Sequence, residues 1–251
     1  MEILACIKRV PITGSQLILT SDGQSLQTDN MGYGISPHEE NAVEAGVQLT
    51  EQMGGQLTLL TLGPNDAEEQ LRASLAVGAS RAILLETDGK DWDPQATANA
   101  LVEAIKAEPT KFDLIIFGAE SADSAGYQIH IRVAHALGIP IITNVKGMKV
   151  EGGKVRGERV AGTQREVYEA PLPAIVTVRD GLNVPRYPSV PGRMQARKKP
   201  VDIKPAGGSA PKLEKLKLTV VPSKATGAEI LGNGADAVPA LVEKFKEIGV
   251  L

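Results

Sequence analysis

Short segments that are apolar almost throughout alternate with amphipathic, helix-like segments over the first 145 residues of this chain. Because their side chains can be buried on both faces, such segments are typical of strands in a parallel sheet that helices cover on both sides. The alternation therefore predicts an α/β fold with a doubly wound, mostly parallel sheet. The strand-like segments are residues 2–8, 56–62, 81–87, 113–119 and 139–145.

The helix predicted over residues 36–55 has clear start and stop signals. Ser36 suits the N-cap, Pro37 suits the first helical position, and Glu39 completes a capping box three residues after the cap. A pair of glycines follows the last apolar positions, as glycines commonly do at helix ends. The helix should therefore begin directly after Ser36.

The pattern changes after residue 145. Residues 145–160 predict a β-hairpin extension that turns at Gly152-Gly153. An earlier hairpin is predicted over residues 16–29. Residues 166–178 predict a single strand, in which two prolines indicate an irregular start or an edge position.

The last part of the chain is rich in Gly, Pro, Ala and Lys and ends in an amphipathic helix over 236–251. We therefore expect two parts, a nucleotide-binding α/β domain over 1–204 and a C-terminal arm with its helix over 205–251. Such an arm can wrap around a partner, or its helix can dock on its own domain. Helical spacing alone does not decide between these two arrangements.

Composition excludes several classes of protein. A net charge of −3 and an aromatic content of 3% argue against a nucleic-acid-binding module. No apolar run approaches the length of a membrane span, so no insertion into a membrane is expected. A single cysteine, Cys6, allows no internal disulfide. With no targeting signal in the opening residues, the expected location is cytoplasmic.

Common catalytic and metal-binding motifs are also missing. The sequence has no H-E-x-x-H, no C-x-x-C, no P-loop and no nucleophile elbow. Its three histidines, His38, His130 and His135, are scattered and are expected to be structural or exposed. We therefore expect no metal site and no catalytic residues.

One loop remains as a candidate ligand site. Residues 118–128 follow a predicted strand and precede a helix, and ligands of doubly wound sheets bind outside the carboxyl ends of the strands. Small residues allow a close approach, and a helix N-terminus favours an anion such as phosphate. The alternative is a solvated turn in which Asp123 or Ser124 caps the following helix.

Two longer segments resemble a known family. They are "LPAIVTV" at 172–178 and "LNVPRYPSVPGRMQARKKP" at 182–200, and "ACIKRVP", "LAVGASRAILL" and "EGGKVRGER" add to the likeness. Together these segments are similar to the electron transfer flavoprotein beta subunit, and the resemblance covers essentially the whole chain.

The resemblance implies an electron carrier with no bond chemistry of its own. Such a protein is a heterodimer with an alpha subunit, which holds most of the FAD. The beta subunit has an adenine nucleotide alpha-hydrolase-like fold and binds AMP structurally; electron-bifurcating members hold a second FAD there instead. The complex accepts electrons from flavin dehydrogenases and passes them to a quinone reductase or another acceptor.

The resemblance also assigns the residues of a nucleotide pocket. One departure from the family pattern is Ala125, where many members have a second Asp, and this leaves AMP and a second FAD both open. The assigned residues are Cys6, Ser36, Pro37, His38, Glu39, Leu62, Gly118, Ala119, Asp123, Ser124, Gly126, Tyr127, Gln128 and Ile129.

The proline-rich stretch at 184–199 corresponds to the loop with which the family docks its redox partners, and we refer to it as the docking loop. By the resemblance, Val190 is its apolar anchor, which an apolar pocket of a partner could receive. Prolines such as Pro188 restrict the free loop, so that less entropy is lost on binding. Basic side chains can steer acidic partners, and they are Arg193, Arg197, Lys198 and Lys199.

Two functions of other classes remain as alternatives. An ATP-hydrolysing or AMP-forming enzyme on the same fold usually carries a Ser-Gly-Gly phosphate loop after the first strand, where this chain has "CIKRVPIT". A stand-alone ATP- or AMP-binding module of the universal-stress type would leave residues 182–251 unexplained. Both alternatives therefore account for less of the sequence than an electron carrier does.

Overall fold

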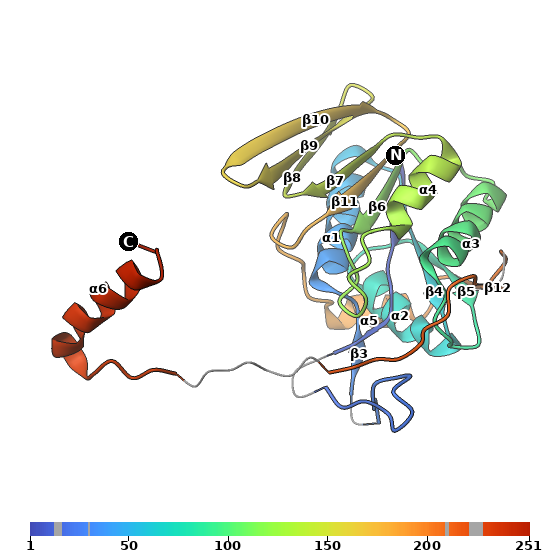
Figure 1. Cartoon of the computed structure of the whole chain (residues 1–251). Helices are drawn as coiled ribbons and strands as arrows, with labels where there is room; N and C mark the ends of the chain where they lie inside the picture. Colours follow the sequence, from blue (N-terminus) through green and yellow to red (C-terminus); the bar gives the residue numbers. More distant parts are fainter. Residues whose placement is uncertain (13–16, 30, 209–210, 221–227) are drawn as a thin grey trace. The chain divides into compact units, whose positions relative to one another are not determined.

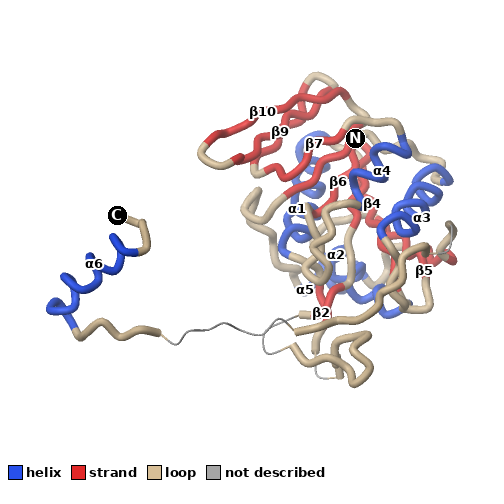
Figure 2. The backbone as a smooth tube through the Cα atoms, viewed as in Figure 1, coloured by secondary structure: helices blue, strands red, loops and turns tan. Residues whose placement is uncertain are grey.

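The computed structural model describes residues 1–12, 17–29, 31–208, 211–220 and 228–251. The chain divides into two compact units, Met1–Lys217 and Leu218–Leu251. Figure 2 shows strands and helices in the first unit and the helix α6 in the second.

A seven-stranded parallel sheet forms the centre of the first unit, with strand order β12-β5-β4-β1-β6-β11-β7 (Figure 1). This arrangement confirms the predicted α/β class. The strands are β1 (Glu2–Cys6), β4 (Gln56–Gly63), β5 (Arg81–Glu86), β6 (Leu114–Gly118), β7 (Ile141–Val145), β11 (Ala174–Val178) and β12 (Val201–Pro205).

Helices cover both faces of this sheet, as the apolar strands predict. The helices are α1 (Pro37–Met53), α2 (Glu68–Ala76), α3 (Pro94–Ala107) and α4 (Ile129–Leu137), and a short 3-10 turn, η1 (Asn65–Ala67), precedes α2. α1 and α2 contribute to one buried apolar cluster, and α3 and α4 contribute to another. Successive residues of β1 alternate between the two clusters, Ile3 and Ala5 in the first and Leu4 and Cys6 in the second.

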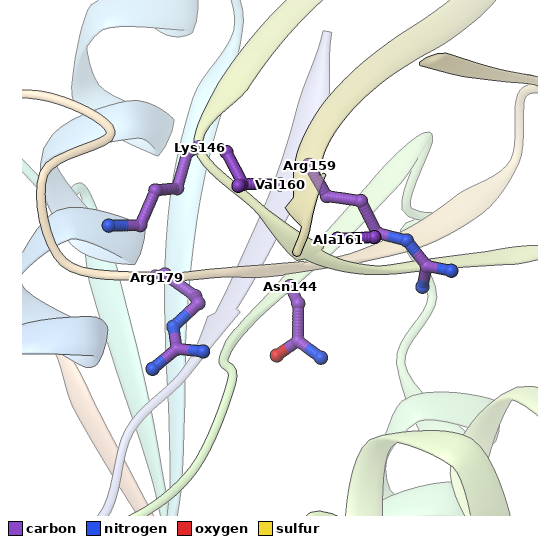
Figure 3. Close-up of a pocket in the computed structure, with 6 residues that line it drawn as sticks. All are labelled: Asn144, Lys146, Arg159, Val160, Ala161 and Arg179. Atoms are coloured by element: carbon purple, nitrogen blue, oxygen red, sulfur yellow. The ribbon is translucent and has the colours of Figure 1, made fainter. Parts of the chain in front are cut away.

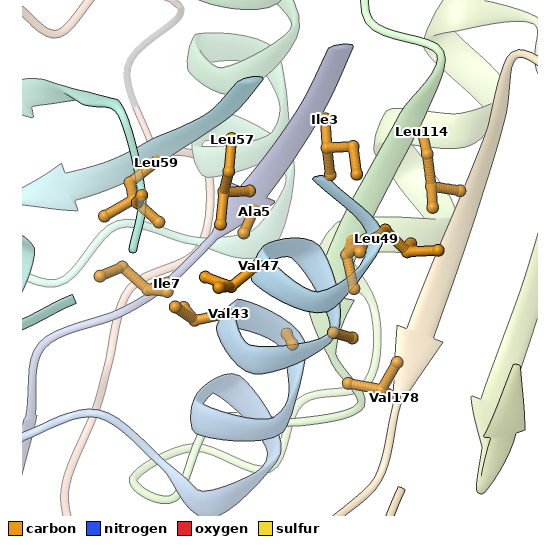
Figure 4. Packing of buried hydrophobic residues seen from close by; sticks show 14 of the residues in the cluster. Ile3, Ala5, Ile7, Val43, Val47, Leu49, Leu57, Leu59, Leu114 and Val178 are labelled. Atoms are coloured by element: carbon orange, nitrogen blue, oxygen red, sulfur yellow. The ribbon is translucent and has the colours of Figure 1, made fainter. Parts of the chain in front are cut away.

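Figure 4 shows the first cluster, in which side chains of α1 lie against those of β1 and β4. Ile3, Leu57 and Leu59 are almost completely inaccessible to solvent. Burial of one such side chain stabilises a fold by about 1.5–3 kcal/mol. The packing therefore holds α1, and with it the N-terminus of α1, firmly on the sheet.

A second, antiparallel sheet has the order β10-β9-β8, from β8 (Gly147–Glu151), β9 (Lys154–Ala161) and β10 (Gln164–Pro171). β8 and β9 form the predicted hairpin, and both Gly152 and Gly153 at its turn have positive φ. The prediction of one strand over 166–178 is wrong, because β10 and β11 belong to different sheets. The break between the two strands lies at Pro171 and Pro173. Because a proline has no backbone N–H, neither residue can donate a hydrogen bond that would continue the ladder.

The hairpin predicted over 16–29 is reduced to one antiparallel bridge, Leu19 with Leu26, and residue 16 lies outside the described part. β2 (Val10–Pro11) and β3 (Tyr33–Gly34) form a separate small pair.

The proline-rich stretch is more regular than its sequence suggests. Within it lies a short helix, α5 (Val190–Ala196), and β12 then pairs with β5 at the edge of the parallel sheet. Residues after β12 continue along the first unit, because the amides of Lys212 and Leu213 donate to Asp93 at 2.6 and 3.1 Å.

The second unit contains η2 (Gly234–Ala237) and α6 (Val238–Glu247), close to the predicted terminal helix. No residue of α6 is buried, and Val238 and Leu241 of the helix and Ile248 at its C-cap are exposed apolar side chains at helical spacing. The predicted arm includes residues 209–210 and 221–227, which lie outside the described part.

Candidate functional site

Three neighbouring strands end side by side at the carboxyl edge of the parallel sheet. Cys6, the last residue of β1, pairs with Leu60 of β4 and with Phe117 of β6. β4 continues through Leu62, and β6 ends at Gly118. Ligands of doubly wound sheets bind outside this edge. The sequence-predicted residues at the ends of the three strands are therefore neighbours.

Gly118 brings the N-terminus of α1 to this edge. A Cβ at this position would lie 2.8 Å from Cγ of Glu39 and 3.1 Å from Cβ of His38. Since real Cβ atoms do not approach other atoms as closely as 2.8 Å, only glycine permits this contact. The Ser36 hydroxyl also donates to the carbonyl oxygen of Glu120 at 3.3 Å. The predicted site residues at 36–39 therefore lie against the start of the stretch 118–129.

Glu39 is a buried carboxyl group at this junction. Its Oε2 accepts hydrogen bonds from the backbone N–H and the hydroxyl of Ser36, at 2.8 and 3.0 Å. Burial raises the pKa of Glu39 to about 7, although these bonds and the Lys8 charge oppose the rise. Burial, together with the Glu39 charge, also raises the pKa of the Cys6 thiol, so Cys6 stays protonated and acts as a packing group.

Glu39 should make the stability of the chain depend on pH. Its pKa is 4.5 when exposed and about 7 in the folded chain, so the folded state holds this proton more tightly. The free energy of unfolding should therefore fall as the pH rises from about 4.5 to about 7, by up to about 3 kcal/mol from this group. Glu39→Gln should remove this part of the dependence.

Urea unfolding of the nucleotide-free chain at several pH values between 5 and 8 measures this effect. Glu69→Gln is a matched control, because it makes the same charge change at an exposed position of α2. If Glu39→Gln and wild type lose stability in parallel over this range, the carboxyl group of Glu39 does not titrate as we expect.

Residues 119–128, which we call the carboxyl-edge loop, connect β6 to α4. Lys8 Nζ and Asp123 Oδ2 form an ion pair at 2.5 Å that joins this loop to the segment after β1. The hydroxyls of Ser121 and Ser124 lie 2.8 Å apart. Residues 122–128 are all exposed, so the loop presents its groups to solvent along the edge.

The carboxyl-edge loop is not the simple helix cap considered as an alternative. α4 begins only at Ile129, and Gln128 stands at its N-cap position, so neither Asp123 nor Ser124 caps it. Ala125 and Tyr127 have φ of 45° and 52°, the left-handed region that non-glycine residues rarely adopt. Such conformations cluster at ligand sites.

His38 connects the carboxyl edge to the segment after β11. Its Nδ1 accepts a hydrogen bond from the backbone N–H of Asp180 at 2.8 Å, and its Nε2 lies 3.3 Å from Glu120 Oε1. Because Nδ1 is an acceptor, Nε2 carries the proton in the neutral ring. His130 differs, since its burial lowers its pKa to about 4 and keeps it neutral beside Phe117.

The start of the docking loop is held against α1. The Arg186 guanidinium donates to Glu44 at 2.9–3.2 Å and to Glu51 at 2.6–2.9 Å. Glu44 is 3% exposed, and a buried carboxylate requires such pairing. Beside it, the backbone N–H of Asn183 donates to Asn41 Oδ1 at 3.1 Å. Sequence reasoning missed these contacts, which join residues 135 or 142 positions apart along the chain.

The rest of the docking loop is fixed on α2. The Ser189 hydroxyl accepts the N–H of Gly192 and caps α5. A Cβ on Gly192 would lie 2.5 Å from the carbonyl oxygen of Ala76, so glycine is needed for α5 to approach α2. Ala196 is buried, and its carbonyl accepts from Arg72 at 2.8 Å. The loop is therefore a supported structure.

The predicted docking side chains differ in what they contact. Lys199 Nζ donates to the carbonyls of Leu75 and Ala79 near the end of α2, at 2.9 and 2.6 Å. Val190 is instead 74% exposed. The other large apolar side chains exposed on this loop are Val184, Tyr187 and Met194. The docking loop thus presents an apolar surface on rigid backbone, at residues separate from those at the carboxyl edge.

Among the described residues, no group of three or more His, Cys, Asp or Glu side chains could hold a metal ion. No helix in the described part of the chain is long and apolar enough to cross a membrane.

Comparison with known proteins gives consistent matches. A sequence model of the Electron transfer flavoprotein domain matches residues 25–207. The electron transfer flavoprotein subunit beta of Bacillus subtilis is 32% identical over 255 residues, which cover 98% of each protein. The subunit of the same name from Syntrophomonas wolfei is 34% identical and covers 92% of this chain and 90% of its own. The caffeyl-CoA reductase-Etf complex subunit CarD of Acetobacterium woodii is 32% identical, with 98% of each covered.

Proposed function

This chain belongs to the electron transfer flavoprotein family as a beta subunit, and from that premise we propose how it serves electron transfer. It pairs with an alpha subunit that holds most of the FAD, binds AMP structurally at its own carboxyl edge, and docks redox partners. Electrons pass from flavin dehydrogenases through the FAD to a quinone reductase or another acceptor. The chain itself makes and breaks no bonds. We propose a cytoplasmic location, in line with its single, buried cysteine.

One observation carries the nucleotide part of this proposal. The residues that the family resemblance assigns to AMP come from four separate stretches of chain, and the fold brings them to one edge of the sheet. The carboxyl-edge loop there has two non-glycine residues in the left-handed region. A bound nucleotide would explain these two left-handed residues, since strained backbone conformations occur mainly at ligand sites and other functional sites.

A second FAD in place of AMP is the alternative. One relative of this chain is named as a subunit of a caffeyl-CoA reductase-Etf complex. A reductase as partner would also suit this chain. Both ligands carry an adenosine phosphate, so the same loop could hold either one.

Nucleotide release from the purified heterodimer tests this proposal. Acid extraction followed by mass analysis should yield one AMP for each FAD, whereas a second FAD would give two FAD and no AMP. Added AMP should also stabilise nucleotide-free chain by about 2.7 kcal/mol at a hundredfold excess over its Kd.

Gly118→Ala should lower the AMP content, because its Cβ would push the N-terminus of α1 away from β6. Gly63→Ala is a matched control at the end of β4, where an added Cβ would meet only the Ala67 Cβ at 3.4 Å. Heterodimer that contains no adenine nucleotide beyond the single FAD, and that AMP does not stabilise, would refute the proposed binding.

A further inference from the structure

A cavity lies at the carboxyl edge, between the ends of β7 and β11 and the strand β9. It has a volume of about 390 Å³, which is within the range of small-molecule sites. None of its lining residues is among those predicted to hold the nucleotide. Figure 3 shows the residues that line this cavity, which we call the cationic pocket: Asn144, Lys146, Arg159, Val160, Ala161 and Arg179.

Two of the three cations that line the cationic pocket have no counter-charge among the described residues. Three of its six lining side chains are cations, and none is a carboxylate. Arg159 forms an ion pair with Glu166 of β10. In the described part of the chain, Lys146 and Arg179 form no ion pair. Two positive charges therefore face one cavity without a counter-charge, an arrangement that favours an anion.

Two of the side chains that line this cavity each have one polar atom that is buried without a partner among the described residues. One is a donor, Nε of Arg179, and the other is an acceptor, Oδ1 of Asn144. Buried polar atoms nearly always find a partner, so unpaired atoms of both kinds in one cavity call for a ligand with both kinds of group. Asn144 has a φ of 59°, in the left-handed region. Its backbone N–H donates to the Thr177 hydroxyl at 2.9 Å, and this hydrogen bond holds the backbone of Asn144 in place.

We infer that the cationic pocket binds the phosphate group of a small, hydroxyl-bearing molecule, such as a sugar phosphate. Guanidinium and ammonium groups bind phosphate oxygens through charge-assisted hydrogen bonds. Asn144 Oδ1 accepts a hydroxyl of the same molecule, and Val160 and Ala161 form an apolar wall beside it. A carboxylate from a partner protein would engage the cations but has no hydrogen to donate to Asn144 Oδ1.

Calorimetric titration of the heterodimer, with its nucleotide site first saturated with AMP, tests this inference. The probes are inorganic phosphate and ribose 5-phosphate at low ionic strength. Wild type should bind both, and ribose 5-phosphate more tightly. Lys146→Gln with Arg179→Gln should weaken both by at least about tenfold, because charge-assisted bonds are lost. Asn144→Gly, which tolerates the left-handed backbone, should remove only the preference for ribose 5-phosphate.

A matched control is Lys149→Gln with Arg156→Gln. These cations lie on β8 and β9, are paired with Glu151 and Glu158, and line no part of the pocket. Equal losses in the control and in the pocket variant would mean that the probes respond only to net charge, which would overturn the inference. If a variant does not fold, the wild-type titration alone tests the inference. Wild type that shows no saturable binding of either probe would also overturn the inference.

Discussion

Heterodimers should not form when the beta chain is cut after Lys217. Residues 218–251 are a compact unit of their own, and their helix α6 leaves its apolar side chains exposed. A helix of 10 residues is marginal in water, so α6 needs a surface to cover its apolar face. We propose that this surface belongs to the alpha subunit. Co-purification of tagged alpha subunit with full-length and shortened chains measures the effect.

The cut is placed at 217 because the preceding residues contact the first unit. Lys212 and Leu213 donate to Asp93, the N-cap of α3, and Lys215 forms an ion pair with Asp91. The shortened chain should therefore keep a cooperative unfolding transition and its stabilisation by AMP. Its co-purification with the alpha subunit at full yield would refute the proposed role of the second unit.

Substitutions in α6 and at its C-cap, Ile248, test whether the apolar side chains of this helix are what assembly needs. Leu241→Glu with Ile248→Glu places charges on the apolar face and should act like the deletion. Glu243→Ala with Lys246→Ala removes an exposed ion pair at no net change in charge, and assembly should persist. Loss of assembly in both pairs would indicate that α6 acts through its stability rather than through its apolar side chains.

The sheet could be predicted from the sequence because its central strands are apolar on both faces. β12 could not, since its sequence VDIKP alternates charged with apolar residues and it pairs on one side only. α5 was missed for another reason. Its N-cap, Ser189, is followed by proline only at the second helical position, whereas Ser36 is followed directly by Pro37. Two prolines and a glycine in the same short stretch also favour a loop when only the local sequence is considered.

The candidate site was predictable in its residues but not in its contacts. The family resemblance supplied 36–39 and 118–129, whereas the close approach of Gly118 to Glu39 depends on how β6 and α1 pack. The basic run at 197–199 shows the same limit. Lys199 donates to one carbonyl in the last turn of α2 and to one just after the helix, and nothing in a run of cations distinguishes that residue from its neighbours. Long-range hydrogen bonds are set by the tertiary fold, which local patterns do not contain.

Val190→Asp should slow reduction by a cognate dehydrogenase at least tenfold, equivalent to about 1.4 kcal/mol. The substitution removes an apolar side chain that is 74% exposed and places a carboxylate where an apolar pocket of the partner cannot solvate it. It should not disturb the docking loop. Val190 is the first residue of α5, and a negative charge at a helix N-terminus is favourable.

Two comparison variants separate anchoring from steering. Val190→Leu keeps an apolar anchor and should retain most of the rate. Arg197→Gln with Lys198→Gln removes charges at the rim and should lower the rate mainly at low salt, since exposed charges steer association more than they hold the complex. Lys199 is left unchanged, because its ammonium group holds the end of α2.

Stopped-flow reduction of the heterodimer by the dehydrogenase across a salt series measures all three variants. Reduction by dithionite is the control, because it needs no docking and should be equal in every variant. The loss caused by Val190→Asp should persist at high salt, since a desolvated carboxylate is screened far less than an exposed charge. A Val190→Asp heterodimer that is reduced by the dehydrogenase as fast as wild type would show that residues 184–199 connect two parts of the fold and do not dock a partner.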